Sequence, residues 1–266
     1  MAVNRINEFI DCVKKSKDLK TLVETELKYL DNNLVLSSKK RAISRYRNAI
    51  KASLGLDCEV LKTFKLTLDE IKEFNHQKEL QKDHDHTHLK PLDPIDVTER
   101  AIELLHTKGS YTKVAIALCL LTGRRSVEIL KTAKFTYVRD DRILFDGQVK
   151  KGDLESKPYE IPVLYDASEI IKALNYVREL TNFADLSNDA IHSRTNKTMN
   201  EAAKKHFGGV IKGVSVKSLR SAYAEIISFW HKPDHISKAK FMAGVLGHSE
   251  LDKSTAQSYE DFYIVD

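Results

Sequence analysis

Hydrophobic positions along most of this chain recur every three or four residues, and that period predicts a mainly α-helical protein. The clearest N-terminal example is the segment over residues 37–54. Its apolar side chains share one helix face, at i, i+3, i+4 and i+7 spacing: Ala42, Ile43, Tyr46, Ala49, Ile50 and Leu54. Ser37 or Ser38 can cap this helix with a hydroxyl oxygen. We therefore expect a helical N-terminal domain over residues 1–74.

A polar stretch, residues 75–94, follows that domain and has no hydrophobic period. It ends in two prolines, which stop helices, so it is interpreted as a linker. His84, His86 and His88 alternate within it and could in principle hold a metal ion. Zinc sites usually need more ligands and supporting hydrogen bonds around them. A polar hinge without a metal site is the favoured interpretation.

Helical periodicity resumes at Asp96, and a strand-like region interrupts it once. The expected helices are Val97–Leu105, Tyr111–Leu121, Arg125–Lys131, Ala167–Leu180, Asn200–Phe207, Val216–Phe229, Ser237–Leu246 and Thr255–Tyr263. The strand candidates are Arg142–Lys151 and Lys157–Leu164, and Gly152–Ser156 between them favours a hairpin turn. A second domain, residues 95–266, is therefore predicted to combine α-helices with a small antiparallel β-sheet.

The composition narrows the class of protein. The 266 residues suffice for one large domain or two ordinary ones, and 42% hydrophobic with 30% charged residues indicates a soluble globule. No apolar run approaches the ~20 residues that span a bilayer, and the first residues lack a signal-peptide core. Three scattered cysteines, Cys12, Cys58 and Cys119, favour a reducing cytosol over a disulfide framework. We expect a cytoplasmic protein that does not engage a membrane.

The net charge of +5 is compatible with a polyanionic partner without requiring one. Basic residues fill the polar faces of the predicted helix over residues 37–54, and no acidic residue occurs from Asn32 to Leu56. They are Lys39, Lys40, Arg41, Arg45, Arg47 and Lys51. Such a helix can lie against DNA phosphates. Taken alone, the segment slightly favours a solvated basic face.

Two arginines in the second domain have partners suited to phosphate chemistry. Glu128 lies three residues after Arg125 on a predicted helical turn, so its carboxylate can orient the guanidinium. Lys217 and Arg220 share the start of another predicted helix, where cations and backbone N–H groups together favour phosphate. Each pair alone is more simply a helical ion pair or an exposed basic face.

A histidine and a tyrosine follow near the end of the chain. His248 comes after Gly247 in a predicted tight turn, and Tyr259 lies in a polar stretch that should leave its hydroxyl accessible. Alone, they are more simply a core histidine and a surface tyrosine. Together with two fork-shaped guanidiniums that can grip one phosphate, they suit attack on a phosphodiester by a tyrosine hydroxyl.

This ordered combination resembles the tyrosine recombinase family, which shares its catalytic architecture with type IB topoisomerases. The family's boxes match Thr122-Gly-Arg-Arg125-Ser-Val-Glu128, Lys217-Ser-Leu-Arg220, Leu246-Gly-His248-Ser249 and Thr255-Ala-Gln-Ser-Tyr259. The family's hairpin lysine falls at Lys150 or Lys151, and the resemblance covers about residues 92–266. It implies a helical DNA-clamp domain followed by a catalytic domain that needs no metal or cofactor.

The resemblance also implies the site residues and the partner. The catalytic set is Arg125, Lys150, Lys217, Arg220, His248 and Tyr259. Lys150 is favoured as general acid by its spacing from Arg125, whereas Lys151, directly before Gly152, fits the common integrase pattern and is otherwise a DNA contact. The implied partner is double-stranded DNA with an inverted-repeat site, bound by a dimer, in a prokaryote or a phage.

Two departures from the family pattern look like the telomere resolvase (protelomerase) branch, which forms covalently closed hairpin DNA ends. Lysine replaces the usual histidine at Lys217, and the spacing from His248 to Tyr259 is longer than in most integrases. One feature points the other way, since the sequence ends soon after Tyr259 and many resolvases continue into a further domain. Telomere resolution is the favoured function. The alternatives are an integrase that joins two duplexes, a topoisomerase and a non-catalytic DNA-binding protein.

Overall fold

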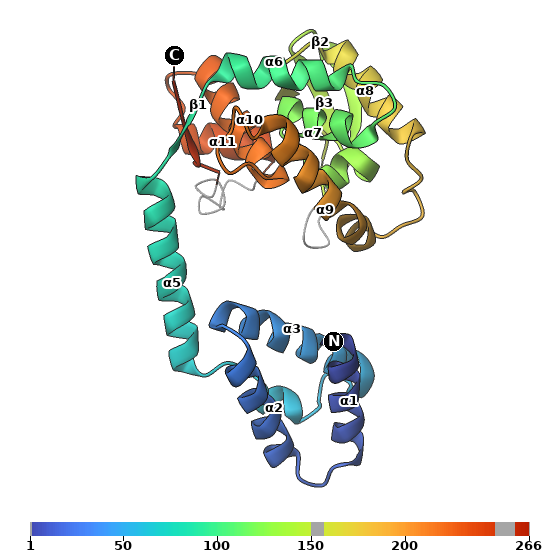
Figure 1. Cartoon of the computed structure of the whole chain (residues 1–266), viewed down its shortest axis with the longest axis vertical. Helices are drawn as coiled ribbons and strands as arrows, with labels where there is room; N and C mark the ends of the chain where they lie inside the picture. Colours follow the sequence, from blue (N-terminus) through green and yellow to red (C-terminus); the bar gives the residue numbers. More distant parts are fainter. Residues whose placement is uncertain (1, 150–156, 248–258, 266) are drawn as a thin grey trace. The chain divides into compact units, whose positions relative to one another are not determined.

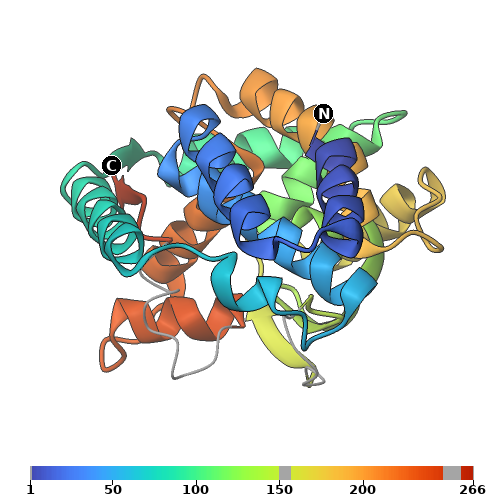
Figure 2. The same ribbon diagram turned by 90° about the horizontal axis from the view of Figure 1, so that it is seen from below.

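The structure is a computed structural model that describes residues 2–149, 157–247 and 259–265. It divides the chain into two compact units, residues 1–84 and 85–266, each with its own hydrophobic core (Figures 1 and 2). None of the helices described is long and apolar enough to cross a membrane.

The first unit is helical. It contains α1 (Ala2–Lys15), α2 (Leu19–Asn33), α3 (Leu36–Leu54), α4 (Val60–Thr63) and most of α5 (Leu68–Thr87). Ile43, Tyr46 and Ile50, from the predicted apolar stripe of α3, are buried, which confirms that helix and its inward face. The predicted serine cap is wrong, because the helix begins earlier, at Leu36, with Val35 as its N-cap residue and no side-chain cap.

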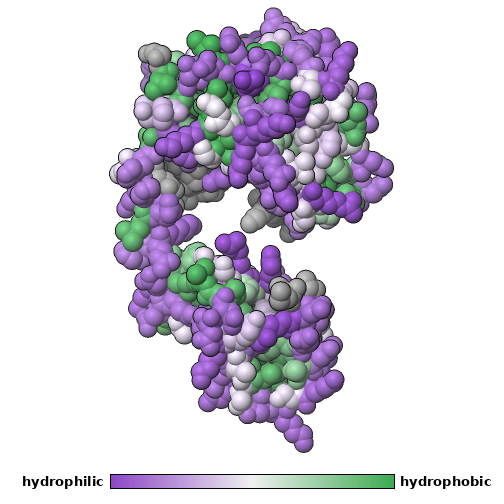
Figure 3. Space-filling view, in the orientation of Figure 1, coloured by the Kyte–Doolittle hydropathy of each residue, from purple (hydrophilic) through white to green (hydrophobic). Residues whose placement is uncertain are grey.

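The segment interpreted as a linker differs from the expectation, because α5 runs through it as far as Thr87. No glycine or proline interrupts residues 68–90, and a helix needs no hydrophobic period where no face of it enters a core. Its surface is mostly hydrophilic (Figure 3), with Ile71 and Leu80 exposed, and Gln77 donates a hydrogen bond to Glu73 one turn away. The side chain of His86 lies outside the described residues.

The core of the second unit is built around α7 (Tyr111–Thr122). This helix is buried from Val114 to Thr122, and it packs against α6 (Pro94–Leu105), α8 (Ala167–Glu179), α9 (Asn188–Phe207) and α10 (Val216–His231) (Figure 1). A π-helical turn, η1 (Glu128–Thr132), follows α7, and α11 (Lys238–Leu246) packs against α10. The central helix thus coincides with the predicted helix Tyr111–Leu121, whose residues are nearly all apolar.

The predicted antiparallel strand pair is confirmed as β3 (Arg142–Asp146) and β4 (Tyr159–Pro162), both shorter than expected. A third strand, β2 (Lys134–Arg139), pairs with the other edge of β3 and was not predicted. It escaped the pattern because five of its six positions are exposed, so it lacks a clear hydrophobic alternation. The predicted turn at Gly152–Ser156 lies outside the described residues.

The expected helix Thr255–Tyr263 is wrong at its C-terminal end. Phe262–Ile264 form strand β5, which pairs in parallel with β1 (Lys90–Leu92) from the start of the unit. Phe262 is buried at this pairing, and the backbone N–H of Val265 donates to the carbonyl of Leu92. The burial of Phe262 beside a strand far away in sequence outweighs the local helical period. Residues 255–258 of that prediction lie outside the described residues.

Candidate active site

The turn that follows α7 presents two adjacent arginines in opposite ways. Gly123 ends the helix in the left-handed conformation (φ +65°), and a Cβ at this position would lie 2.2 Å from the ring of Tyr223. Glycine is required there both by conformation and by space. Arg124 turns inward and is only 1% exposed, whereas Arg125 is half-buried. The turn thus offers only Arg125 to a ligand.

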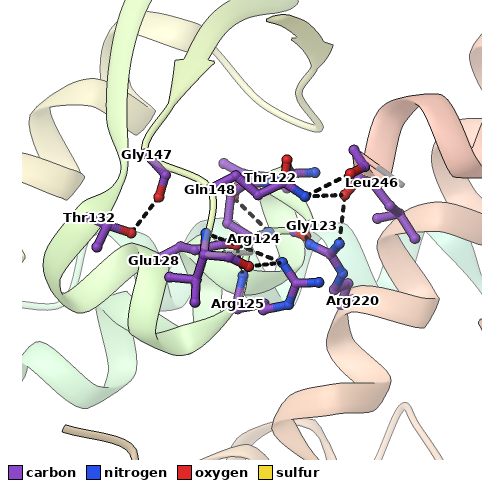
Figure 4. A network of polar contacts seen from close by, with 12 residues as sticks. Thr122, Gly123, Arg124, Arg125, Glu128, Thr132, Gly147, Gln148, Arg220 and Leu246 are labelled. Carbon is purple, nitrogen blue, oxygen red and sulfur yellow. Dashed lines mark hydrogen bonds and ion pairs between the residues drawn. The ribbon is translucent and has the colours of Figure 1, made fainter. Parts of the chain in front are cut away.

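Glu128 orients Arg125, as its i+3 spacing predicts. The Arg125 Nη1 atom lies 2.7 Å from one carboxylate oxygen of Glu128, and the Arg125 backbone N–H donates to the other at 2.8 Å (Figure 4). Burial alone would lower the pKa of Arg125, but the charge and hydrogen bond of Glu128 outweigh it and raise that pKa. Burial would raise the pKa of Glu128, yet Arg124, Arg220 and Arg125 together hold it below its usual value. Both groups are therefore fixed in their charged forms.

Arg220 projects from the second turn of α10 into the same region. It is 3% exposed, donates one Nη to the carbonyl of Gly123 and places the other 2.7 Å from the carbonyl of Leu246 (Figure 4). Its Nε–H is buried and has no hydrogen-bond partner among the described residues. Burial and the like charges of Arg124 and Arg125 lower the pKa of Arg220 to about 10. A buried cation with an unused donor is suited to binding an anion.

Tyr259 lies against this arginine. The guanidinium carbon of Arg220 is 5.4 Å from the centre of the Tyr259 ring, and Tyr259 acts electrostatically on both Arg220 and Arg125. Tyr259 as a whole is only 8% exposed, so most of this side chain is buried, although its neighbours in sequence are polar. Its polar sequence neighbours do not reveal this burial, since the chain returns to the core at Phe262 three residues later. The structure brings the tyrosine and the two arginines together.

The structure describes only one of the other predicted catalytic residues, Lys217. Lys150, Lys151 and His248 lie outside the described residues. The described residue before the hairpin lysines, Val149, is next to the site, because its backbone N–H donates to Glu128 at 3.1 Å. Lys217 is exposed one turn before Arg220, at the start of α10, where Ser215 and Ser218 form a capping box.

The basic face of α3 is divided between exposed and structural residues. Lys39 is buried and pairs with Asp31 and Glu70, so it is not available as a phosphate contact. Arg47 is half-buried, and its Nη1 donates to the carbonyls of Leu61 and Phe64, so this nitrogen holds the fold of the unit. Four predicted residues remain exposed on the helix, namely Lys40, Arg41, Arg45 and Lys51. Periodicity alone cannot distinguish an exposed lysine from a buried one whose acidic partners come from other helices.

The site also contains three residues that the sequence patterns did not reveal. Arg124 donates to the hydroxyl of Tyr159 at 2.6 Å and to the carbonyl of Val245 at 2.5 Å. Gln148 donates to the carbonyl of Gly247 at 2.8 Å. Arg124, Tyr159 and Gln148 bind groups that lie far away along the chain, so the sequence around them does not mark them as site residues. The position of Arg124 next to Arg125 was the one local indication.

The chain was compared with known families and structures. The model of the telomere resolvase ResT/TelK catalytic domain matches residues 88–262. The chain belongs to the telomere resolvase family. The match spans the arginine turn, α10 and Tyr259, so the site lies within the segment that matches the catalytic domain.

Individual relatives agree with this membership. The protelomerase of Yersinia phage PY54 is 28% identical over 201 residues, which cover 66% of this chain and 32% of the phage protein. The chain thus spans about a third of the length of that relative. A solved structure of a TelA protelomerase variant covalently complexed with substrate DNA matches with a TM-score of 0.89 at 26% identity, covering 99% of this chain and 88% of that one. TelK complexed with substrate DNA shares the fold, with a TM-score of 0.67 at 18% identity over 99% of this chain and 59% of that one.

Proposed function

We propose that this telomere resolvase breaks and rejoins DNA through a 3′-phosphotyrosyl intermediate and produces covalently closed hairpin ends. The observation that carries the proposal is the convergence of Arg125, Arg220 and Tyr259 at one buried site in a telomere resolvase catalytic domain. Solved structures of TelA include a covalent complex with substrate DNA and a complex with a DNA hairpin product, which support the same chemistry here.

Cleavage begins when the Tyr259 oxygen attacks a backbone phosphorus. The P–O bond to the 5′ oxygen breaks, which leaves a 3′-phosphotyrosine and a 5′-hydroxyl. Arg125 and Arg220 stabilise the added negative charge on the pentacovalent phosphate, and their fork-shaped donors match its oxygens. Lys150 gives a proton to the leaving 5′ oxygen, while His248 and Lys217 bind non-bridging oxygens or accept the tyrosine proton.

Rejoining repeats the transesterification in reverse with a different hydroxyl. A 5′-hydroxyl from the opposite strand attacks the phosphotyrosine, displaces Tyr259 and closes a hairpin. The energy of the broken phosphodiester stays in the phosphotyrosyl ester, so no nucleotide cofactor is needed. The cationic side chains supply the charge stabilisation that a metal ion supplies in other phosphoryl-transfer enzymes, so none is proposed.

DNA binding is proposed to use both units of the chain. The exposed residues of α3, Lys40, Arg41, Arg45 and Lys51, supply phosphate contacts from residues 1–74, and residues 95–266 carry the catalysis. Residues 75–94 connect these domains as a clamp segment that is helical as far as Thr87. The substrate is an inverted-repeat site on which two copies act as a dimer, in the cytoplasm, and the protein is encoded by a prokaryote or a phage.

The test is incubation with a DNA end that carries an inverted repeat, followed by a denaturing gel. Hairpin formation gives a single strand twice the length of the duplex arm between the cleavage site and the end of the substrate, because the two cut strands of that arm become covalently joined. Recombinant duplexes would instead indicate an integrase, and relaxed circles from supercoiled plasmid would indicate a topoisomerase. Binding without any covalent product would overturn the enzymatic proposal.

A further inference from the structure

Three successive carbonyl groups at the C-terminal end of α11 are bound by three different side chains. Arg124 donates to Val245 at 2.5 Å, Arg220 to Leu246 at 2.7 Å, and Gln148 to Gly247 at 2.8 Å. The last carbonyls of a helix have no partner within the helix and carry its partial negative charge. Donors from outside therefore fix where this helix ends.

The turn at the end of α11 requires glycine at position 247, because the side chains of Tyr159 and Gln148 lie against it. Gly247 is left-handed (φ +69°), and a Cβ there would lie 2.1 Å from the Tyr159 hydroxyl and 2.6 Å from Oε1 of Gln148. The backbone of Gly247 can approach these side chains only because it has no Cβ. Gln148 thus lies against the turn, with Nε2 donating to the Gly247 carbonyl and Oε1 close to the place that a Cβ of residue 247 would take.

Gln148 itself is held by the rest of the site. The residue before it, Gly147, is left-handed (φ +88°), and its carbonyl accepts a hydrogen bond from the hydroxyl of Thr132 in η1 (Figure 4). The residue after it, Val149, donates its N–H to the Glu128 carboxylate that orients Arg125. Because the backbone is fixed on both sides of Gln148, its side chain starts from a fixed place. Its hydrogen bond to the Gly247 carbonyl can therefore hold the turn in one position.

We infer that Gln148 is a positioning residue for the reaction, which holds the Gly247 turn directly before His248 in the sequence. The inference rests on the proposed function, because it gives His248 a role at the scissile phosphate. Gln148 touches neither phosphate nor nucleophile in this account. It connects the carboxylate that orients Arg125 with the turn at the end of α11, whose Leu246 carbonyl Arg220 binds.

The test uses the full chain with Gln148→Leu and Gln148→Glu, and Asn175→Leu as the matched control. Both Gln148 variants lose the Nε2 donor, while Asn175→Leu removes an amide from an exposed position of α8. Formation of the covalent adduct should fall about tenfold in each Gln148 variant, as expected for one lost hydrogen bond that acts on the rate. DNA affinity and Tm should stay near those of the control. A parallel loss of adduct, affinity and Tm would make Gln148 a merely structural residue and overturn the inference.

Two further measurements test whether Gln148 acts through His248 or through the hairpin lysine, which follows it in the sequence. If Gln148 acts through the Gly247 turn, combining Gln148→Leu with His248→Ala should cost no more than His248→Ala alone. Additive losses would contradict that coupling. A substrate with sulfur at the bridging 5′ position should not rescue Gln148→Leu, because sulfur leaves without a proton and so repairs only a missing acid. Rescue would overturn the inference and show that Gln148 acts by supporting the hairpin lysine as general acid. If the unsubstituted chain forms no adduct at all, the proposed function itself fails, which is a distinct result.

Discussion

Among single residues, the two adjacent arginines after Gly123 differ most in what they can do. The guanidinium of Arg124 donates to Thr122, Tyr159 and Val245, whereas Arg125 is half-buried and interacts electrostatically with Tyr259. We predict that Arg125→Ala or Arg220→Ala lowers the cleavage rate by ~10²-fold or more, as loss of an oxyanion donor does. DNA affinity should fall far less, because many other phosphate contacts remain. Parallel losses of affinity and cleavage would make these arginines ordinary DNA contacts.

The nucleophile is tested by comparing two tyrosines near the end of the chain. Tyr259 lies beside Arg220, whereas Tyr263 is exposed in β5. Tyr259→Phe should abolish the covalent protein–DNA adduct on a denaturing gel and leave DNA binding nearly intact, because only the attacking oxygen is lost. Tyr263→Phe should retain the adduct. An adduct that survives in Tyr259→Phe and maps to Tyr263 would refute the assignment.

The general acid is tested by changing the leaving group. A lysine that protonates the 5′ oxygen becomes unnecessary when sulfur replaces that oxygen, because a thiolate leaves without a proton. Lys150→Ala should therefore cleave the natural substrate slowly and the sulfur substrate at nearly the rate of the unsubstituted chain. Rescue of Lys151→Ala instead would move the role by one residue. Rescue of neither variant would place the acid outside the hairpin.

At the scale of elements, the site depends on the turn between α7 and η1. Buried Glu128 there faces three arginines, and they hold its pKa below the ~4.3 of an unfolded glutamate. Because the folded pKa is the lower one, this carboxylate stabilises the fold fully above the unfolded pKa. That contribution disappears as the pH falls through the folded pKa.

We therefore expect the free energy of unfolding, followed by urea denaturation, to decline below about pH 4.3. Glu128→Gln keeps the shape of the side chain but removes the charge. This variant should be less stable at neutral pH and should show a shallower decline in acid. Equal slopes for the two proteins would indicate that other carboxylates account for the acid sensitivity.

At the scale of the whole molecule, the basic face of α3 is expected to contribute to DNA affinity through counterion release. Replacing Arg41, Arg45 and Lys51 with alanine should reduce the slope of log affinity against log salt by about 1 for each lost phosphate contact. The matched control replaces Lys14, Lys17 and Lys20, which are exposed in the same unit and remove the same charge. Equal effects of the two triple variants would show that only net charge matters.

The sequence by itself determined features that involve near neighbours along the chain, and the order in which the motifs follow one another. The helical period located α3, α6, α8, α10 and α11, because helix faces are made of near neighbours in sequence, and a nearly continuous apolar run located α7. The spacing of Arg125 and Glu128 predicted their ion pair for the same reason. The order of four motifs pointed to the family, since each motif carries its own reactive side chain.

Only the tertiary structure decided how distant segments share one site. Arg220 and Leu246 meet across α10 and α11, Gln148 reaches Gly247 from the strand region, and β5 pairs with β1 from the other end of the unit. The same holds for Lys39, whose buried charge is compensated by Asp31 and Glu70 from neighbouring helices. The physical reason is that burial and charge pairing depend on neighbours in space, and a one-dimensional period carries information only about neighbours along the chain.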